Sequence, residues 1–497
     1  MKKVAVLLSM AAVVAVLVAG LSGAFGTEDT SSVYASSLAG ISAAGETGIQ
    51  VQNLDASQDA AITAVFYGQN GAAPVSVPAG TTGPGEAAGF YLPNIQELPD
   101  GAYACIVNSD RQIAAIARTD WQSSGGAAIY SNVIPGTDVA VPLALKAYYG
   151  QCSLVSVQNT DTDAPANADF EVYETGADAP TLTVPVQIAP GTSVTLDLCG
   201  GDEFAGLPDS FVGSIRVKSQ TEIGVQSFID IETSQKAVYA FEGVPADEAS
   251  SELYVPLFRR RQPFNPADPN TGYYDTGISV VNPNSSPVQA TVKYYGALGA
   301  PDCVGQTFTQ GPVEIAANSS VVFYQGPAAQ PGTGMAPLPE NCTGSATIEA
   351  AGGTVLAIVN DSLDYTVESA AYNAMTTEQA STIVAMPLFR SGHTSWNLWT
   401  GISAMNTGDG DATITIEATS AGGEVLKDKA GMSQTVGPNE TALFWPAWAD
   451  SGDFTDPSKA VGSATITSNQ PVAVIVNDIS LAGKADSSTY NGINAEQ

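Results

Sequence analysis

A strand-like phrase that ends in asparagine occurs four times in this chain, and it constrains the fold more than any other feature. The copies end at Asn53, Asn159, Asn282 and Asn406, so the intervals between them are 106, 123 and 124 residues. A period of that length is the size of a domain and far exceeds one turn of a solenoid. Whatever repeats is therefore scaffold, and whatever occurs in one copy alone is a candidate for function.

Every copy carries the same succession of short strand signals around that phrase. A Pro-Leu strand precedes it in copies two to four, and a strand rich in β-branched and aromatic residues follows it in all four. No stretch keeps a helical period, and each copy closes on a short strand around a tyrosine: Tyr130, Tyr239, Tyr372 or Tyr490. Seven short strands in units of about 100 to 130 residues predict an immunoglobulin-like β-sandwich.

The sequence therefore predicts an all-β protein built from four tandem immunoglobulin-like β-sandwich domains. Units of this size can bury a core alone, so we expect four domains in a row rather than one large fold. The expected repeats span residues 27–135, 136–246, 247–382 and 383–497, after a signal peptide at residues 1–26. Each repeated asparagine stands where the chain must reverse, and we expect it to form the turn by bonding its own backbone.

The first residues have the layout of a secretory signal peptide. Met1-Lys2-Lys3 supplies positive charge, the run Val4 to Leu21 supplies the apolar middle, and Ala24-Phe25-Gly26 offers small residues for cleavage before Thr27. A retained membrane anchor is the alternative, since the run approaches spanning length. Nothing later in the sequence resembles a membrane span. We therefore expect a secreted, extracellular protein with no integral membrane span once the signal is cleaved.

The charge balance excludes one class of partner. The formal net charge is −33, from 17 Lys and Arg residues against 50 Asp and Glu residues. Such a balance opposes binding to nucleic acid or to anionic lipid. Only 13% of the residues are charged, so the polar surface must consist mostly of Ser, Thr, Asn, Gln and Gly. This composition suits an exported β-protein.

Five cysteines in an exported chain favour pairing. Cys152 and Cys199 bracket part of the second copy, and Cys303 and Cys342 flank an insertion in the third. We expect the disulfides Cys152–Cys199 and Cys303–Cys342, each of which would close a loop of about forty residues and add about 3 to 4 kcal/mol. The remaining Cys105 is in register with apolar residues of the other copies, which predicts a buried core thiol rather than a nucleophile.

Several phrases together resemble a known group of proteins. They are the signal-like start, Pro256-Leu-Phe-Arg259, the phrase Gly277 to Asn282, Gly344-Ser-Ala-Thr-Ile348 and Val476-Asn-Asp478. In combination they resemble the tandem Ig-like repeats of secreted bacterial surface proteins, most closely those of filamentous Chloroflexota-type bacteria. The resemblance implies an extracellular location and a structural or adhesive role, and it supplies no active-site residue. The sequence has no Leu-Pro-x-Thr-Gly motif for covalent attachment to a cell wall.

Catalytic motifs are scarce. His393 is the only histidine, which removes a Ser-His-Asp triad built elsewhere and any zinc site that needs two histidines. We expect it to be a surface-loop residue. No glycine cluster opens a helix, so there is no phosphate-binding loop.

Acidic residues gather in the turns after the repeated asparagines. In copy two, Asp161, Asp163 and Asp169 crowd one segment, and calcium takes six to eight oxygens, which closely spaced carboxylates can supply in part. The third copy has no acid in this turn, which opposes a site common to all repeats. Calcium at this one place is the only cofactor left open, and solvated turn carboxylates are the simpler interpretation.

Tryptophan is the sharper asymmetry between copies. Four of the five lie in copy four, at Trp396, Trp399, Trp445 and Trp448. Trp399 and Trp445 stand at register positions that other copies fill with polar residues, so we expect them to face outward. Outward aromatic rings can stack on sugars or anchor a protein contact. The alternative is that they cover a seam between domains or the rim of a sheet.

Arg259-Arg260-Arg261 is a lone basic cluster in an acidic chain. A counter-charge to neighbouring carboxylates is the simpler interpretation, and a salt-sensitive contact between chains is the alternative.

The leading hypothesis is an exported, non-enzymatic protein of the cell surface or extracellular matrix, with a structural or adhesive role and a capacity for self-assembly. Its partners would be other copies, other surface proteins or glycans. The alternative is a carbohydrate-binding protein that uses the tryptophans of copy four. A glycoside hydrolase ranks last, because a pair of acids at catalytic spacing cannot be located from sequence.

Overall fold

The computed structural model describes residues 31–36, 45–69, 73–121, 126–231, 237–264, 272–326, 337–363, 368–393, 397–427, 430–445, 460–480 and 487–495. The expected signal peptide lies outside these residues, as do Trp396 and Trp448. The described chain is all-β, and its helical turns are three short 3-10 segments. No helix among the described residues is long and apolar enough to cross a membrane.

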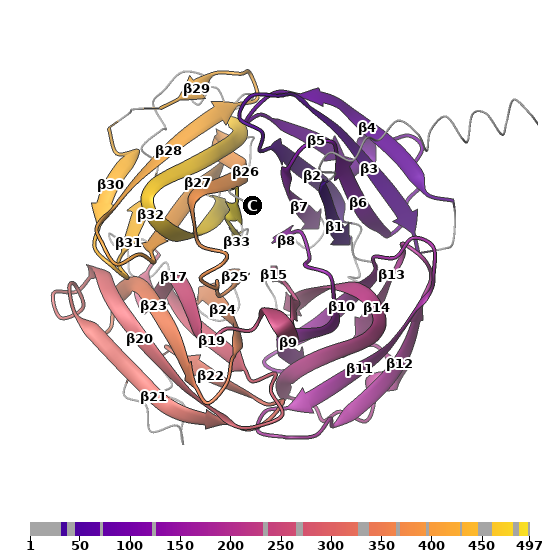
Figure 1. Ribbon diagram of the computed structural model, residues 1–497. Coiled ribbons are helices and arrows are strands. Elements are labelled where there is room, and N and C mark those ends of the chain that lie inside the picture. The colour runs from indigo at the N-terminus through magenta and orange to yellow at the C-terminus, as the bar shows by residue number, and fades with distance from the viewer. Residues whose placement is uncertain are drawn as a thin grey trace, which may run out of the picture.

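The strands form four successive sets, which we call units 1 to 4 (Figure 1). Unit 1 contains β1 (Ser31–Ser36), β2 (Glu46–Asn53), β3 (Ala60–Gly68), β4 (Val75–Thr82), β5 (Ala87–Tyr91), η1 (Leu92–Asn94), β6 (Tyr103–Ser109), β7 (Ile113–Trp121) and β8 (Gly126–Ser131). Unit 2 contains β9 (Gly136–Lys146), β10 (Gln151–Asn159), β11 (Ala166–Glu174), β12 (Leu182–Ile188), β13 (Ser193–Asp197), η2 (Asp202–Phe204), β14 (Phe211–Ile231), β15 (Ala237–Glu242) and β16 (Val244–Pro245), and η3 (Ala246–Glu248) follows it.

The other two units repeat this order. Unit 3 contains β17 (Glu252–Arg260), β18 (Gln262–Pro263), β19 (Tyr273–Val281), β20 (Val288–Gly299), β21 (Thr307–Ile315), β22 (Ser320–Tyr324), β23 (Cys342–Ala351), β24 (Leu356–Leu363) and β25 (Glu368–Asn373). Unit 4 contains β26 (Ser381–His393), β27 (Leu398–Asn406), β28 (Ala412–Ser420), β29 (Val425–Leu426), β30 (Ser433–Val436), β31 (Thr441–Phe444), β32 (Val461–Ser480), β33 (Ser487–Asn491) and β34 (Ile493–Asn494).

Each unit is an antiparallel sandwich: unit 1 has two four-stranded sheets, unit 3 has a four-stranded and a five-stranded sheet, and the strands of units 2 and 4 are linked into continuous sheets of eight and nine strands. In unit 1 the strand orders are β1-β6-β3-β4 and β5-β2-β7-β8. Units 2 and 4 have the same pairings, but in each of them one long strand, β14 or β32, runs through both sheets. This strand makes the pairings that β6 and β7 make in unit 1. We number the strand positions of every unit from one to eight after β1 to β8 of unit 1. The asparagine strand always occupies position two, and it pairs with the strand at position seven.

Two details differ from the expectation for each unit. There are eight principal strands rather than seven, because the fourth strand was missed: β4, β12 and β21 each carry a proline, which weakens a strand signal in the sequence. The sheets also group strands 1, 3, 4 and 6 against 2, 5, 7 and 8. An immunoglobulin constant domain groups 1, 2, 4 and 5 against 3, 6 and 7, so the strand order here is a different one.

Period-two alternation builds the core of each sandwich. Along β3, Ala60, Ile62, Ala64 and Phe66 are buried, while the residues between them are exposed or half-buried. Such a strand turns one face to the facing sheet and the other outward. Cys105 on β6 lies in the same core.

The four units close into a ring, so the expectation of four domains in a row is wrong. In Figure 1 the units follow one another around a centre, and unit 4 returns to unit 1. The eighth strands, β8, β15, β25 and β33, lie nearest the centre, and each contacts the next one around the ring. Each sandwich has a core of its own, and side chains on its outer faces also pack against the neighbouring units.

Apolar contacts cross the seams between units. Ile116 and Ile129 of unit 1 join the core cluster of unit 4, and Ile358 of unit 3 joins that of unit 2. Ile475 of unit 4 joins the cluster of unit 3. The seventh strand thus points one set of side chains into its own sandwich and the alternate set into the preceding unit. Burial at these seams stabilises the contact between neighbouring units.

A repeated turn also fastens each seam. The residue at the turn before the fifth strand has positive φ in every unit: 70° at Gly85, 69° at Gly191, 57° at Asn318 and 63° at Asn439. The preceding unit contacts this turn. Ser463 Oγ donates to Gly85 O at 2.9 Å across the seam between units 4 and 1, and Ser345 Oγ donates to Asn439 O at 2.5 Å across the seam between units 3 and 4.

Polar side chains meet at the ends of the central strands. The Glu242 carboxylate accepts a hydrogen bond from Ser131 N at 2.5 Å and another from Asn373 Nδ2 at 3.1 Å, and Asn491 Nδ2 donates to Asn373 O at 2.7 Å. These four residues come from the four units. Burial raises the pKa of Glu242. The centre is therefore joined by hydrogen bonds between units as well as by apolar contact.

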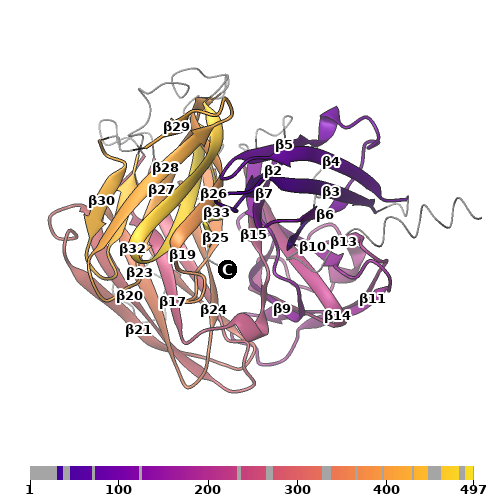
Figure 2. The same cartoon turned by 45° about the horizontal axis from the view of Figure 1, so that its top comes forward.

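The outer rim is formed by strands that are poor templates for further pairing. Figures 1 and 2 place β4, β21 and β30 at the periphery. Pro78, Pro185 and Pro312 interrupt β4, β12 and β21, and the fourth strand of unit 4 is divided into two short pieces, β29 and β30. A proline cannot donate a ladder hydrogen bond, so these edges resist edge-to-edge association.

Candidate binding site on unit 4

The repeated asparagines are structural. All four side chains are buried, and each bridges two turns. Asn53 Oδ1 accepts a hydrogen bond from Asp55 N at 3.0 Å, while Asn53 Nδ2 donates to Gln58 O at 2.8 Å and to Thr82 O at 3.0 Å. The other three asparagines make the corresponding bonds. The prediction that these residues form turns is confirmed.

The three aspartates considered for calcium do different things. Asp161 Oδ1 accepts hydrogen bonds from Asp163 N at 2.8 Å and from Ala164 N at 3.1 Å, so its carboxylate caps the turn. Asp163 is exposed in that turn, and Asp169 is exposed on β11. Within the described ranges, no three His, Cys, Asp or Glu residues form a group that could hold a metal ion. Calcium binding here stays a prediction.

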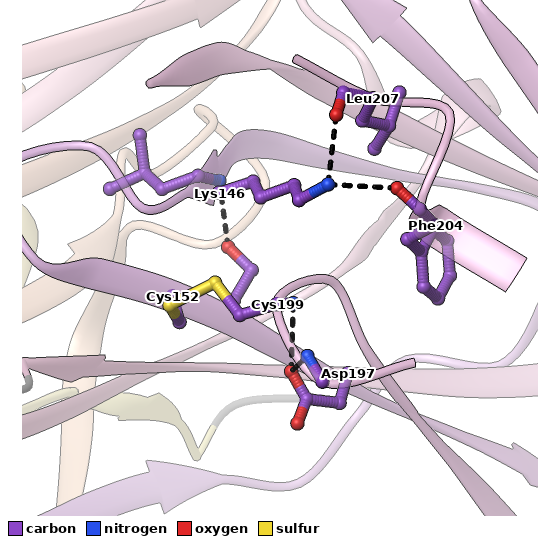
Figure 3. The surroundings of a disulfide bond; sticks show 9 residues. Lys146, Cys152, Asp197, Cys199, Phe204 and Leu207 are labelled. Carbon is purple, nitrogen blue, oxygen red and sulfur yellow. Dashed lines mark hydrogen bonds between the residues drawn. A yellow bond between two sulfur atoms is a disulfide. The ribbon is translucent and has the colours of Figure 1, made fainter. Parts of the chain in front are cut away.

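Both expected disulfides are present. Cys152 at the start of β10 is bonded to Cys199, just after β13, with the Cα atoms 5.9 Å apart (Figure 3). Cys303 is bonded to Cys342 at the start of β23, with the Cα atoms 5.4 Å apart. Each disulfide joins a connecting segment to a strand of the same unit: the segment after β13 to β10, and the segment before β21 to β23.

A buried cation reinforces the same region. Lys146 Nζ donates to the backbone carbonyls of Phe204 at 2.9 Å and Leu207 at 2.8 Å, which holds the segment after Cys199 against β9 (Figure 3). In unit 3 the equivalent residue is Arg260, whose guanidinium donates to the carbonyls of Leu338, Gln325 and Gly326. Two units thus secure the connection from the fifth to the sixth strand with a buried cation, and in unit 2 the disulfide acts on the same connection, whereas in unit 3 it joins the connection between β20 and β21 to the start of β23. Unit 4 has Ser391 at this position and contains no cysteine.

The basic cluster of unit 3 is internal. Arg259 Nη1 lies 2.8 Å from Asp361 Oδ2, and Arg261 N donates to Asp275 Oδ1 at 2.8 Å. The Arg261 guanidinium also lies over the ring of Tyr273, 4.1 Å from its centroid. These contacts support the interpretation of the cluster as counter-charge.

Cys105 and His393 occupy unremarkable positions. Cys105 is a free, buried cysteine, and burial raises the pKa of its thiol, so little thiolate forms at neutral pH. This confirms the prediction of a core thiol. His393 is half-buried at the end of β26, where its backbone pairs with Leu398.

Trp399 and Trp445 form an aromatic pair at the start of β27 and the end of β31. Their ring centroids are 6.4 Å apart with an interplanar angle of 45°. Trp399 Nε1 donates to Asn397 Oδ1 at 2.8 Å, which fixes that ring, and Trp399 is half-buried. Trp445 is 47% exposed, so the pair presents one open ring face beside one anchored ring. Large, rigid and partly exposed rings of this kind suit stacking on a ligand.

The position of Trp445 also has a structural role that was not expected from the sequence. Its ring lies over Gly401 on β27, 3.2 Å from where a Cβ atom would be. Tyr324 covers Gly277 and Tyr91 covers Gly48 in the same way. In unit 2 the glycine is replaced by Leu154, and Asp197 stands opposite it. The signal was present in the sequence, because an aromatic residue accompanies the glycine in three copies and is absent where the glycine is absent.

Trp399 is therefore the member of the pair that only unit 4 has. Its register equivalents are Glu46, Cys152 and Asp275. Glu46 accepts a hydrogen bond from Tyr91 Oη at 2.5 Å, so unit 1 fills this position with a polar partner for its aromatic ring. Unit 4 instead places a second indole there, which widens the aromatic surface.

No protein-family model matches this chain, and no curated protein matches it either.

Proposed function

We propose that this protein is an exported, non-enzymatic scaffold of a bacterial cell surface or extracellular matrix, and that it contributes adhesion through loops displayed on a closed ring. The observation that carries the proposal is the ring itself, in which four repeated units share buried seams and join at the centre. Such a scaffold holds its loops in fixed relative positions, as rigid frameworks for binding loops do.

Location outside the cytoplasm has three supports. Disulfides such as Cys152–Cys199 persist in oxidising compartments. The signal-like first residues and the resemblance to repeats of secreted bacterial surface proteins point the same way. The test is expression in a bacterial host with residues 1–26 in place, followed by fractionation and N-terminal sequencing. An extracellular protein that begins near Thr27 is expected, and a cytoplasmic protein that keeps Met1 would contradict the proposal.

Carbohydrate binding at Trp399 and Trp445 is the second candidate function, and the partly exposed indole pair favours it. Glycan-array binding by the full chain should be lost in Trp399→Ala. The matched control is Tyr324→Ala, which removes the ring that covers Gly277 in unit 3, the equivalent of Trp445. Equal binding by wild type and Trp399→Ala would remove this candidate. Measurable hydrolysis of any arrayed glycan would contradict the proposal of a non-enzymatic protein.

A further inference from the structure

One seam of the ring contains a cavity. It lies between unit 4 and unit 1, where the ring closes, and its volume is about 380 Å³. One wall comes from β2 and β5 of unit 1, and the other from the turn after β28 together with the start of β32 in unit 4. The volume is at the lower end of the range for small-molecule sites, which is about 300 to 1,000 Å³.

The cavity exists because two side chains are missing there. Gly89 on β5 pairs with Gln50, and its equivalents in the other units are Thr195, Val322 and Leu443. Leu443 packs against the core cluster of unit 3 and so fills the corresponding seam. Gly89 has no side chain to place there.

The facing wall, in unit 4, also carries a smaller side chain than its equivalent in unit 1. Across the seam between units 1 and 2, Gln69 Nε2 donates to Ser193 Oγ at 3.1 Å and lies 3.5 Å from Thr195 Oγ1. The equivalent residue in unit 4 is Ala421, since Gln69 N and Ala421 N make the same bond to the strand beside them. A glutamine and a threonine therefore close one seam, while an alanine and a glycine leave the other open.

The walls of this cavity are held in place. Gln50 Nε2 donates to Gly462 O at 3.2 Å, and Ser463 Oγ donates to Gly85 O at 2.9 Å. Ser463 and Ser420 are both buried. These bonds fix the parts of the walls formed by β2 and β32, and the exposed turn at residues 421–423 completes the wall of unit 4.

The lining selects the chemistry of a ligand. It contains the Gln50 carboxamide, whose Nε2 already donates to Gly462 O, the Thr419 hydroxyl, the Glu86 carboxylate and several backbone groups, and it contains no lysine or arginine. Without a cation, in a chain of net charge −33, the site opposes anions. A neutral molecule rich in hydroxyl groups can satisfy such a lining on several sides.

An aromatic ring lies beside the cavity. Tyr91 follows Gly89 by two residues, so it is on the same face of β5, and it is 44% exposed. Its hydroxyl donates to Glu46 Oε2 at 2.5 Å, which fixes the ring. A fixed ring next to a polar slot is an arrangement in which an aromatic face stacks on an apolar ligand face while hydrogen bonds orient its polar groups.

We infer that the seam between units 4 and 1 binds a neutral saccharide, with one sugar ring in the slot beneath Gly89 and the neighbouring ring against Tyr91. This site is separate from the Trp399–Trp445 pair and does not require the scaffold function proposed above. Ring closure makes this saccharide site, because residues from the two ends of the repeat array build its two walls.

The test is ligand-observed NMR and calorimetry on the full chain with maltose, cellobiose and lactose as probes. At least one disaccharide should bind wild type, and Gly89→Leu, which copies Leu443, should weaken that binding at least tenfold. Ala421→Gln, which copies Gln69 on the opposite wall, should have the same effect. Because Ala421 is exposed, this second variant keeps the test decisive if Gly89→Leu fails to fold.

The matched control is Tyr324→Ala, which removes from unit 3 the ring equivalent to Tyr91 and should bind the same disaccharide as tightly as wild type. The inference is overturned if none of the three probes binds wild type, or if a folded Ala421→Gln variant binds as wild type does. Loss of binding in Trp445→Ala with no loss in Ala421→Gln would assign the saccharide to the tryptophan pair and also overturn it.

Discussion

The guanidinium of Arg118 in unit 1 donates to the carboxylate of Asp478 in unit 4, with Nη1 and Oδ2 2.7 Å apart. The two side chains are 6% and 1% exposed. Arg390 of unit 4 approaches the same Oδ2 atom at 2.7 Å, and Arg118 also pairs with Asp120 at its more exposed side. The first and last units are thus joined by a buried ion pair between residues 360 positions apart.

Arg118→Ala should destabilise the ring by about 3 kcal/mol, because removal of one partner from a buried ion pair leaves the other poorly compensated. Arg390 still contacts Asp478, which keeps the cost at the lower end of the usual range. Urea unfolding measures the effect. Asp120→Asn is the matched control, since it removes the exposed partner of the same arginine and should cost less than about 1 kcal/mol. Equal costs for the two variants would show that Arg118 does not clasp the ring.

Local features of the fold could be predicted from the sequence, but its closure could not. Alternation along β3 and the turn-forming Asn53 depend on neighbours in the chain, so a single copy displays them. The side chains that join the units look the same as core residues in sequence. Ile116 and Ile358 alternate with core residues on the seventh strand, and nothing local says that they face another unit. Their partners are set by the angle between units, which is a property of the assembled ring.

The candidate site divides in the same way. Register placed Trp399 and Trp445 at polar positions, and the structure leaves Trp445 largely exposed. The role of Trp445 as a cover for Gly401 can be predicted only by comparing two aligned positions on two strands, that of the glycine and that of the aromatic residue, across the four copies. The cavity beside Gly89 could not be predicted from the sequence. Gly89 and Ala421 have small side chains on two walls that meet only when the ring closes.

Loss of the Cys152–Cys199 disulfide should reduce stability by about 2 to 4 kcal/mol. The Cys152→Ser/Cys199→Ser variant removes one restraint on the segment after β13, and Lys146→Met removes the other. Since both act on one segment, their effects should not add, and the combination should differ from the sum by more than about 0.5 kcal/mol. Thermal unfolding of the three variants checks this. Additive costs would mean that Lys146 and the disulfide restrain different parts of unit 2.

Asp275 should make stability depend on pH. Burial raises the pKa of Asp275 from 3.8 to about 6, although Arg261 opposes the shift. The folded protein therefore holds this proton more tightly than the unfolded chain, so the contribution of Asp275 to stability is present below about pH 4 and is lost as the pH rises through about 6. The unfolding free energy of Asp275→Asn, relative to that of wild type, should increase as the pH rises from about 4 to about 7.

Urea titrations at several pH values measure that difference. Asp169→Asn is the control for the loss of one negative charge, because its carboxylate is exposed on β11 rather than buried. A gap between Asp275→Asn and wild type that stays constant over this range would contradict the predicted proton linkage.

The outer edges should keep the ring from associating through its strands. Pro185 interrupts β12, which pairs with β11 on one side and forms the edge of its sheet on the other. Pro185→Val restores a donor and a strand-forming side chain, so it should increase concentration-dependent association while unit 2 stays folded. Light scattering at rising concentration measures this. The control is Pro190→Val, outside the strand, which should leave association unchanged.

The pairing of Gly401 with Trp445 predicts which substitutions unit 4 tolerates. Trp445→Tyr keeps a ring over the glycine, as Tyr324 and Tyr91 do in units 3 and 1, and should change stability by less than about 0.5 kcal/mol. Trp445→Ala uncovers the glycine and removes the contact with Trp399, and should cost about 1 kcal/mol. Trp399→Ala keeps the cover and should cost less than Trp445→Ala. Chemical unfolding of the three variants orders them, and if Trp399→Ala proves the most costly, the main structural role belongs to Trp399 and the equivalence with Tyr91 and Tyr324 fails.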